Sequence, residues 1–194
     1  WLFIVQQQGL EKLSDRLSNI QAAVEPKYFG VELIHYPVPV SDQFFNPRYS
    51  PHLSWKERAL IAALMRQVGN DFVKEALPEI THILSLGCDV ILNDPESLSH
   101  LLEGPSGLTS GIIYARQQNQ PLVLTYEMET RAWNWWWDYP RDHTFKTDWT
   151  GMDILLISRE VFEGITLDDF TIDEYGIGED GWYCIKAREE LGVE

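Results

Sequence analysis

Residues 82–103 read "HILSLGCDVILNDPESLSHLLE", in which a short apolar run meets a single acid, Asp89, before a second apolar run. The first run is flanked by polar residues, which is typical of a buried strand. Further on, Asp94 directly before Pro95 predicts a helix with the acid as its N-cap and the proline at its first position. This stretch therefore predicts a strand, a loop and a helix, with a carboxylate where the strand ends.

Apolar strands alternate with amphipathic helices in the first half of the chain. We expect strands at residues 1–5, 30–40, 81–86, 108–115, 121–127 and 153–158, helices at 10–24, 54–77, 94–103 and 179–191, and a short helix directly after the strand at 153–158. The helix over 54–77 is expected as one helix or as two interrupted at Gly69. This pattern predicts an α/β fold with a mostly parallel central sheet flanked by helices. We expect one domain over residues 1–194 that lacks segments at both ends.

The net charge, the apolar runs and the cysteines of the chain indicate which partners and which compartment to expect. The 194 residues carry a formal net charge of -15, which argues against a nucleic-acid partner and against charge-driven docking on an anionic membrane. No apolar run approaches the length of an integral membrane segment. The two cysteines, Cys88 and Cys184, could form one disulfide, but buried thiols in a reducing compartment are the preferred interpretation. We therefore expect a cytoplasmic protein.

Asp89 is the first candidate for a functional residue. In open α/β sheets, ligands bind beyond the carboxyl ends of the strands, and Asp89 follows directly after such a strand. A carboxylate in this position can bind Mg²⁺ or Mn²⁺ and thereby hold the phosphates of a nucleotide. An acid at a strand end can equally cap a loop, so this feature alone leaves both interpretations open.

A second candidate lies in "GIGEDGWYCIKAREELG", residues 176–192, where Glu179 and Asp180 are adjacent acids between glycines. Acids at a helix N-terminus are favourable in themselves. The surrounding glycines suggest instead that the backbone approaches another group closely. A carboxylate in such a place could take a proton from an attacking hydroxyl.

Together these segments resemble the GT-A-fold nucleotide-diphosphosugar glycosyltransferases, and in particular glycosyltransferase family 2. Residues 81–102 resemble the strand, Asp-x-Asp and helix of that family. Residues 148–164, "DWTGMDILLISREVFEG", resemble a later turn, strand and helix start, and residues 178–192 resemble the family's Glu-Asp motif. The order and spacing of the three segments match over about the last 115 residues of the chain. The resemblance implies a GT-A-like (Rossmann-like) fold and sugar transfer from a nucleotide-diphosphate donor to a hydroxyl acceptor, such as a glycan, a lipid-linked sugar or a protein.

The resemblance also implies roles for individual residues on the donor side. Asp89 matches the last acid of Asp-x-Asp, which would bind Mn²⁺ or Mg²⁺, and Gly87 replaces the first acid. Cys88 lies between them, and Arg66 on the preceding helix could reach a donor phosphate, although a solvated helix charge is the simpler interpretation.

On the acceptor side, the Glu-Asp motif implies that Asp180 is the catalytic base, with Glu179 as the alternative. The resemblance further implies that Gly151 lies in a turn beside the acceptor. The aromatic run that contains Trp135, Trp136 and Trp137 could pack against the C–H faces of a sugar or could fill the core.

Three other functions remain open at this point. Because Gly87 replaces an acid, the domain could be a catalytically degenerate one that binds nucleotide or glycan. A glycoside hydrolase would use two carboxylates without nucleotide or metal. A purely structural partner domain would bind neither nucleotide nor sugar.

Overall fold

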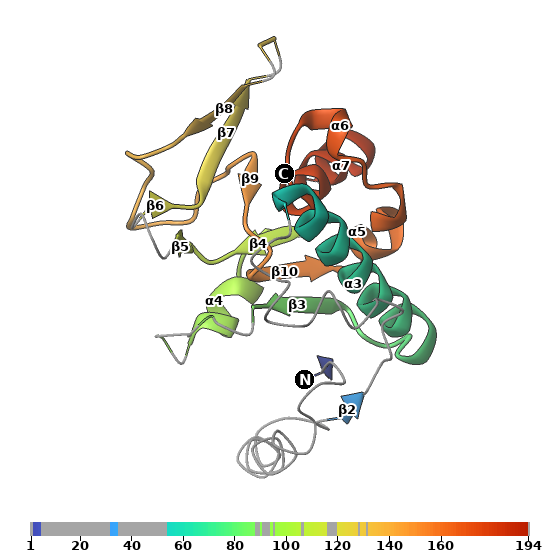
Figure 1. The fold of residues 1–194 in the computed structure, drawn as a ribbon. Helices are drawn as coiled ribbons and strands as arrows, with labels where there is room; N and C mark the ends of the chain where they lie inside the picture. Colours follow the sequence, from blue (N-terminus) through green and yellow to red (C-terminus); the bar gives the residue numbers. More distant parts are fainter. Residues whose placement is uncertain are drawn as a thin grey trace. The chain divides into compact units, whose positions relative to one another are not determined.

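The computed structural model describes residues 2–4, 32–34, 54–87, 90, 94, 96–105, 107–115, 120–127, 129–130 and 132–193 (Figure 1). The chain divides into two compact units, Trp1–Ser54 and Trp55–Glu194. In the described part of the first unit, strands β1 (Leu2–Ile4) and β2 (Glu32–Ile34) pair in parallel. The helix expected at residues 10–24 lies outside the described residues.

The second unit contains all the other described elements. In chain order they are α3 (Trp55–Ala76), β3 (His82–Leu86), α4 (Ser97–Leu102), β4 (Leu108–Ser110), β5 (Tyr114–Ala115), β6 (Gln120–Pro121), β7 (Val123–Glu127), β8 (Ala132–Trp135), β9 (Trp149–Thr150), β10 (Ile154–Ser158), α5 (Arg159–Gly164), the 3₁₀ helix η2 (Leu167–Asp169), α6 (Ile172–Tyr175) and α7 (Glu179–Leu191). The helix α3 is continuous through Gly69. No described helix is both long enough and apolar enough to cross a bilayer.

The prediction of a mostly parallel, GT-A-like (Rossmann-like) central sheet is wrong. The described strands of the second unit form two three-stranded sheets, β3-β10-β4 and β8-β7-β9, and the pair β5-β6, and every pairing in them is antiparallel. The connection from β3 through α4 to β4 does bring two strands that run in the same direction into one sheet. However, β10 lies between them and runs the opposite way.

The apolar run of β10 explains why the sequence pointed to a parallel strand. Continuous apolar runs are typical of parallel strands because helices cover both faces of a parallel sheet. As the central strand of its sheet, β10 is likewise buried on both faces. Ile154 and Leu156 pack with Leu101 of α4, while Leu155 and Ile157 alternate with them and are fully buried.

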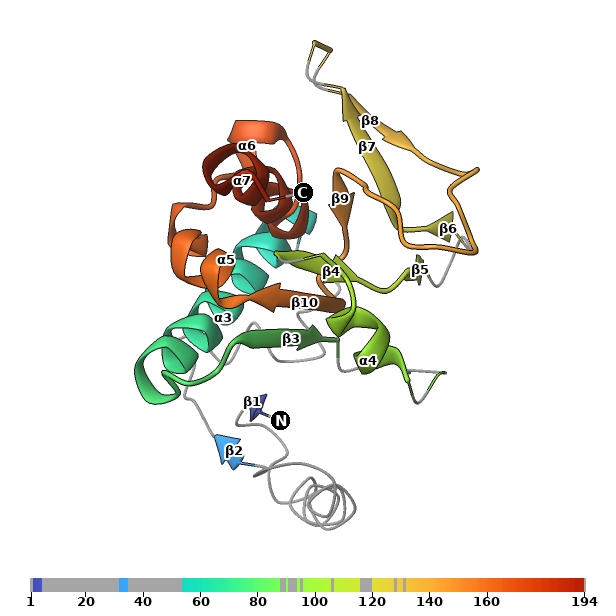
Figure 2. The ribbon, with the colours of Figure 1, turned by 180° about the vertical axis from the view of Figure 1, so that it is seen from behind.

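The core of the second unit is built from β10 and the helices that follow it. Its largest fully buried side chains are Trp182, Tyr183, Phe162, Leu155, Ile157, Ile185 and Val161. These come from α5, α7 and β10, and α3 contacts α5, α6 and α7. Viewed from behind, β7 and β8 extend away from these helices, and β9 is the strand of their sheet that contacts α7 (Figure 2).

The predictions for the end of α7 and for the start of α4 had different outcomes. The helix α7 ends at Leu191, as the sequence predicted, and its C-cap Gly192 has a left-handed φ of 66°. The helix α4 begins later than predicted, at Ser97, and its N-cap is Glu96. The Asp94 carboxylate instead accepts a hydrogen bond from the backbone N–H of Glu96 at 2.9 Å. Asp94 thus caps the turn before the helix.

Candidate functional site

The acids Glu179 and Asp180 lie in the first turn of α7, whose N-cap is Gly178. Asp180 Oδ1 accepts a hydrogen bond from the backbone N–H of Gly181 at 2.8 Å. A Cβ on Gly181 would lie 3.1 Å from Cδ1 of the Trp149 indole. The glycine after the acid pair therefore leaves room for an aromatic ring of β9 to lie against the helix. Two side chains approach this backbone closely, Ile177, whose Cδ1 would lie 2.8 Å from such a Cβ, and Trp149. The sequence did not single out either residue.

Arg66 connects the acid pair to β3 and to the start of β10. Its Nε lies 3.4 Å from Glu179 Oε1, and its Nη1 donates to Ser85 Oγ at 2.8 Å. A longer contact of 3.9 Å joins Nη2 to Asp153 Oδ1. The structure thus brings the predicted donor-binding residue Arg66 into contact with the predicted catalytic residue Glu179, although they lie far apart in the sequence.

Gly87 lies at the same end of the sheet, directly after β3. Its backbone N–H donates to the carbonyl oxygen of Asp153 at 2.8 Å. A Cβ on Gly87 would lie 3.1 Å from both Cγ and Oδ1 of Asp153. The carboxylate of Asp153, the residue before β10, therefore lies beside Gly87, the position at which the resemblance leads one to expect the first acid of Asp-x-Asp.

The predicted metal ligand Asp89 and its neighbour Cys88 lie outside the described residues. Within the residues that the structure describes, no group of three His, Cys, Asp or Glu side chains could hold a metal ion. Asp153, the described carboxylate beside Gly87, is engaged with Arg66. One carboxylate paired with a guanidinium does not fit a magnesium or manganese site, which needs oxygen ligands that remain free for the ion.

Burial sets the electrostatics of the acid pair. It raises the pKa of Glu179 to about 7, with a further increase from the charge of Asp180 and a partial offset by Arg66. Burial also raises the pKa of Asp180, against hydrogen bonding from the Gly181 backbone and the charge of Arg66. Glu179 is only 8% exposed, and Asp180 is the more accessible of the two. The pair can therefore exchange a proton near neutral pH.

The predicted acceptor-binding tryptophans lie at the end of β8 and directly after it, and β7 separates β8 from β9 in the sheet. Trp135 and Trp137 are exposed, with ring centroids 6.2 Å apart, and Trp136 packs edge-on against Phe145 at 5.1 Å. In the sheet, Leu124 of β7 lies opposite both Trp135 of β8 and Trp149 of β9. Two strand spacings, about 9–10 Å, thus separate Trp135 from the tryptophan beside the acid pair.

Gly151, which was predicted to lie in a turn beside the acceptor, is surrounded by other side chains of the protein. It is buried in the short connection between β9 and β10. A Cβ there would lie 3.4 Å from side-chain carbons of both Ile113 and Leu122. Its surroundings are thus apolar side chains of the protein.

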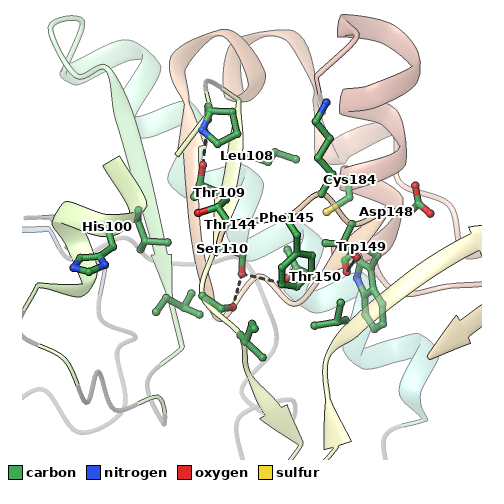
Figure 3. Close-up of a pocket in the computed structure, with 18 of the residues that line it drawn as sticks. His100, Leu108, Thr109, Ser110, Thr144, Phe145, Asp148, Trp149, Thr150 and Cys184 are labelled. Carbon is green, nitrogen blue, oxygen red and sulfur yellow. Dashed lines mark hydrogen bonds between the residues drawn. The ribbon is translucent and has the colours of Figure 1, made fainter. Parts of the chain in front are cut away.

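A cavity of about 860 Å³ is lined by residues of α4, β4, β7, β9, the loop before β9 and α7 (Figure 3). Its lining includes hydroxyl side chains, two aromatic rings and the thiol of Cys184. Trp149 lines the cavity and also contacts Gly181 beside the acid pair. None of Arg66, Asp153, Glu179 and Asp180 is among the lining residues.

Comparison with known proteins leaves the chain without an assigned family. No protein-family description and no curated protein matches the sequence. Among solved structures, one that matches is titled "Crystal Structure of A197 from STIV", with 16% sequence identity and a TM-score of 0.48. The match covers 94% of this chain and 75% of that chain.

Proposed function

We propose that this protein is a glycosyltransferase that moves a sugar from a nucleotide-diphosphate donor to a hydroxyl acceptor such as a glycan. The observation that carries the proposal is the buried acid pair of α7, in which the pKa of Glu179 is raised to about 7 and that of Asp180 is raised as well. The sequence motifs that resemble the glycosyltransferases support it, since residues 178–192 contain Glu179 and Asp180 and residues 148–164 contain Asp153.

In the proposed reaction, the acceptor hydroxyl oxygen attacks the anomeric carbon of the donor sugar. The bond from that carbon to the diphosphate breaks, and its electron pair leaves with the diphosphate. The hydroxyl proton passes to a carboxylate of the pair. Asp180 is the base in this proposal because it is more accessible than Glu179, which Arg66 contacts. Glu179 remains the alternative.

Arg66 acts in this proposal as a positioning residue. Its guanidinium contacts Ser85, Asp153 and Glu179 at once, so it holds the first turn of α7 against the ends of β3 and β10. The same positive charge favours the ionised form of Glu179. Mn²⁺ or Mg²⁺ would supply charge stabilisation for the leaving diphosphate. Because the described residues do not form a site for it, no step is derived through the metal.

Composition and burial support the proposed partners and compartment. A chain with a net charge of -15 does not suit a nucleic-acid acceptor. Cys184 is a free, buried thiol, which suits a reducing compartment and supports the proposed cytoplasmic location.

The test measures release of nucleoside diphosphate from UDP-, GDP-, CDP- and ADP-sugars, in the presence of a mixed glycan acceptor and Mn²⁺. Wild type is compared with Asp180→Asn, Glu179→Gln and the control Glu190→Gln, which lies on the same helix and is exposed. Release by wild type and by the control, with a loss in Asp180→Asn of about 10²–10⁴-fold, is the expected result. Equal rates in all four proteins would refute the assignment.

A degenerate domain that binds nucleotide or glycan without catalysis is the second candidate. It is favoured by Gly87, because an acid there would be crowded by Asp153. A weakened enzyme should gain activity from Gly87→Asp only when Asp153→Ala removes this crowding. If neither the single nor the double variant turns over any donor, but nucleotide still raises the melting temperature, the non-catalytic function is correct.

A further inference from the structure

We propose that the cavity beside β4 and β9 binds a neutral carbohydrate. Its volume of about 860 Å³ lies within the range of roughly 300–1,000 Å³ typical of small-molecule sites. Because none of Arg66, Asp153, Glu179 and Asp180 lines it, this site is distinct from the acid pair, and the inference does not depend on the proposed function.

The charges that line the cavity favour an uncharged ligand over an anion. Three acids and three basic residues balance one another, namely Asp94, Asp142, Asp148, Arg141, Lys146 and Arg188, and the histidines His100 and His143 also line the cavity. Arg188, the basic residue that α7 contributes to the lining, is paired with Asp148. Arg141 lies over the ring of Tyr139, 5.4 Å from its centroid. With no surplus of positive charge, and with a chain of net charge -15 around it, the cavity suits an uncharged ligand.

Hydroxyl groups line the cavity, and the contacts of Ser110 indicate which of the hydroxyls of Ser110 and Thr150 donates to the other. Ser110 Oγ donates to the Gly111 carbonyl at 2.7 Å and lies 2.8 Å from Thr150 Oγ1. Because a hydroxyl has a single proton, Ser110 has none left for Thr150, so Thr150 donates to Ser110. The lone pairs of Thr150 Oγ1 then remain as acceptors. A sugar hydroxyl can donate to them.

Aromatic rings supply the apolar part of the site. Phe145 and Trp149 both line the cavity (Figure 3). Phe145 is held in place by Trp136, edge-on at 5.1 Å, and by Tyr139 at 5.6 Å. A ring fixed in this way gives contact area with little loss of side-chain entropy on binding. A wall that combines such rings with hydroxyl acceptors matches the C–H faces and hydroxyl edges of a sugar.

The test is a titration of the full chain with neutral sugars, followed by saturation-transfer NMR and tryptophan fluorescence. The probes are glucose, galactose, mannose, N-acetylglucosamine and the disaccharides maltose, cellobiose and chitobiose, with inorganic phosphate and UDP as anionic probes. Thr150→Val removes the acceptor without changing the shape of the side chain. Thr130→Val is the matched control, because Thr130 bonds Glu127 on an exposed turn and does not line the cavity.

We expect at least one neutral sugar to bind at millimolar concentration or below. Thr150→Val should weaken this binding about tenfold, corresponding to the loss of one hydrogen bond, and Thr130→Val should leave it unchanged. Thr144→Val tests the same wall if Thr150→Val does not fold. Sugar binding and nucleoside diphosphate release are measured separately on the wild-type protein, so this inference and the proposed function can fail separately.

Three results would overturn the inference. The first is that no sugar of the panel binds at millimolar concentration. The second is that the cavity variants and Thr130→Val bind the sugar equally well. The third is that phosphate or UDP displaces the sugar from the wild-type protein.

Discussion

Replacing Glu179 with glutamine should remove a pH dependence of stability that burial imposes on this carboxyl. Its pKa rises from an ordinary value of 4.5 to about 7 in the folded chain, chiefly through burial and next through the charge of Asp180. Between these values the folded protein keeps a proton that the unfolded chain has released. The associated stability is therefore fully present below pH 4.5 and is lost as the pH rises through about 7.

The size of the effect follows from the gap between the two values. At 1.36 kcal/mol per pH unit, the gap from 4.5 to about 7 corresponds to about 3 kcal/mol. Glu179 is 8% exposed, so solvent screening removes little of this free energy. Glutamine cannot ionise, so the variant does not lose the free energy that ionising a buried carboxyl group costs. The free energy of unfolding of Glu179→Gln, relative to wild type, should thus increase by up to about 3 kcal/mol between low pH and pH 8.

The assay is urea denaturation of the full chain at several pH values between about 5 and 8, with Glu190→Gln as control. Glu190 pairs with Lys186 at 3.3 Å and its side chain is 53% exposed, so its replacement should change stability by less than about 1 kcal/mol at every pH. The reasoning is refuted if the difference between Glu179→Gln and wild type stays constant across this range. A difference that shrinks as the pH rises would contradict it as well.

Two further predictions concern the packing of the second unit. Phe162→Ala should lower the free energy of unfolding by about 3–5 kcal/mol because Phe162 is fully buried, whereas Trp137→Ala, at a ring that is 50% exposed, should cost far less in the same urea titration. Gly107→Ala should cost more than about 2 kcal/mol, because φ is 119° and the new Cβ would collide with Cγ1 of Val193. Its control, Gly176→Ala, has φ of 70° but no atom within 4 Å, so thermal unfolding should show only the backbone cost of about 1 kcal/mol. Equal losses in the two alanine variants would show that Val193 does not limit the space at residue 107.

Local sequence signals predicted most of the elements but not how the strands pair. The run "ILLIS" of β10 and the glycine after α7 indicated a strand and a helix end, and both are present. The direction of β10 could not be read from the run, because a strand buried on both faces has the same composition in a parallel and an antiparallel sheet. No strand was expected in the aromatic run before β9. It begins with β8, since Ala132–Trp135 pairs with β7.

The candidate site likewise contains residues that the sequence predicted and residues that depend on how the strands pair. The glycines around Glu179 and Asp180 drew attention to the acid pair from the sequence alone. Asp153 was missed because its position depends on pairing: Ile154 lies opposite Leu86, so the residue before β10 meets the residue after β3. A parallel arrangement would have separated Asp153 from Gly87. Trp149 was missed for a related reason, since its approach to Gly181 depends on the contact between β9 and α7.

The most direct test of the proposed transferase is the pH dependence of nucleoside diphosphate release by wild type and by Asp180→Asn. If the acid pair supplies the base, the rate with the active donor should rise as the pH increases through about 7, the range in which Glu179 beside Asp180 ionises. Asp180→Asn should be slower by about 10²–10⁴-fold and should lose this rise. A variant with the wild-type rate and pH profile would contradict the account, and so would a wild-type protein that releases no diphosphate from any donor.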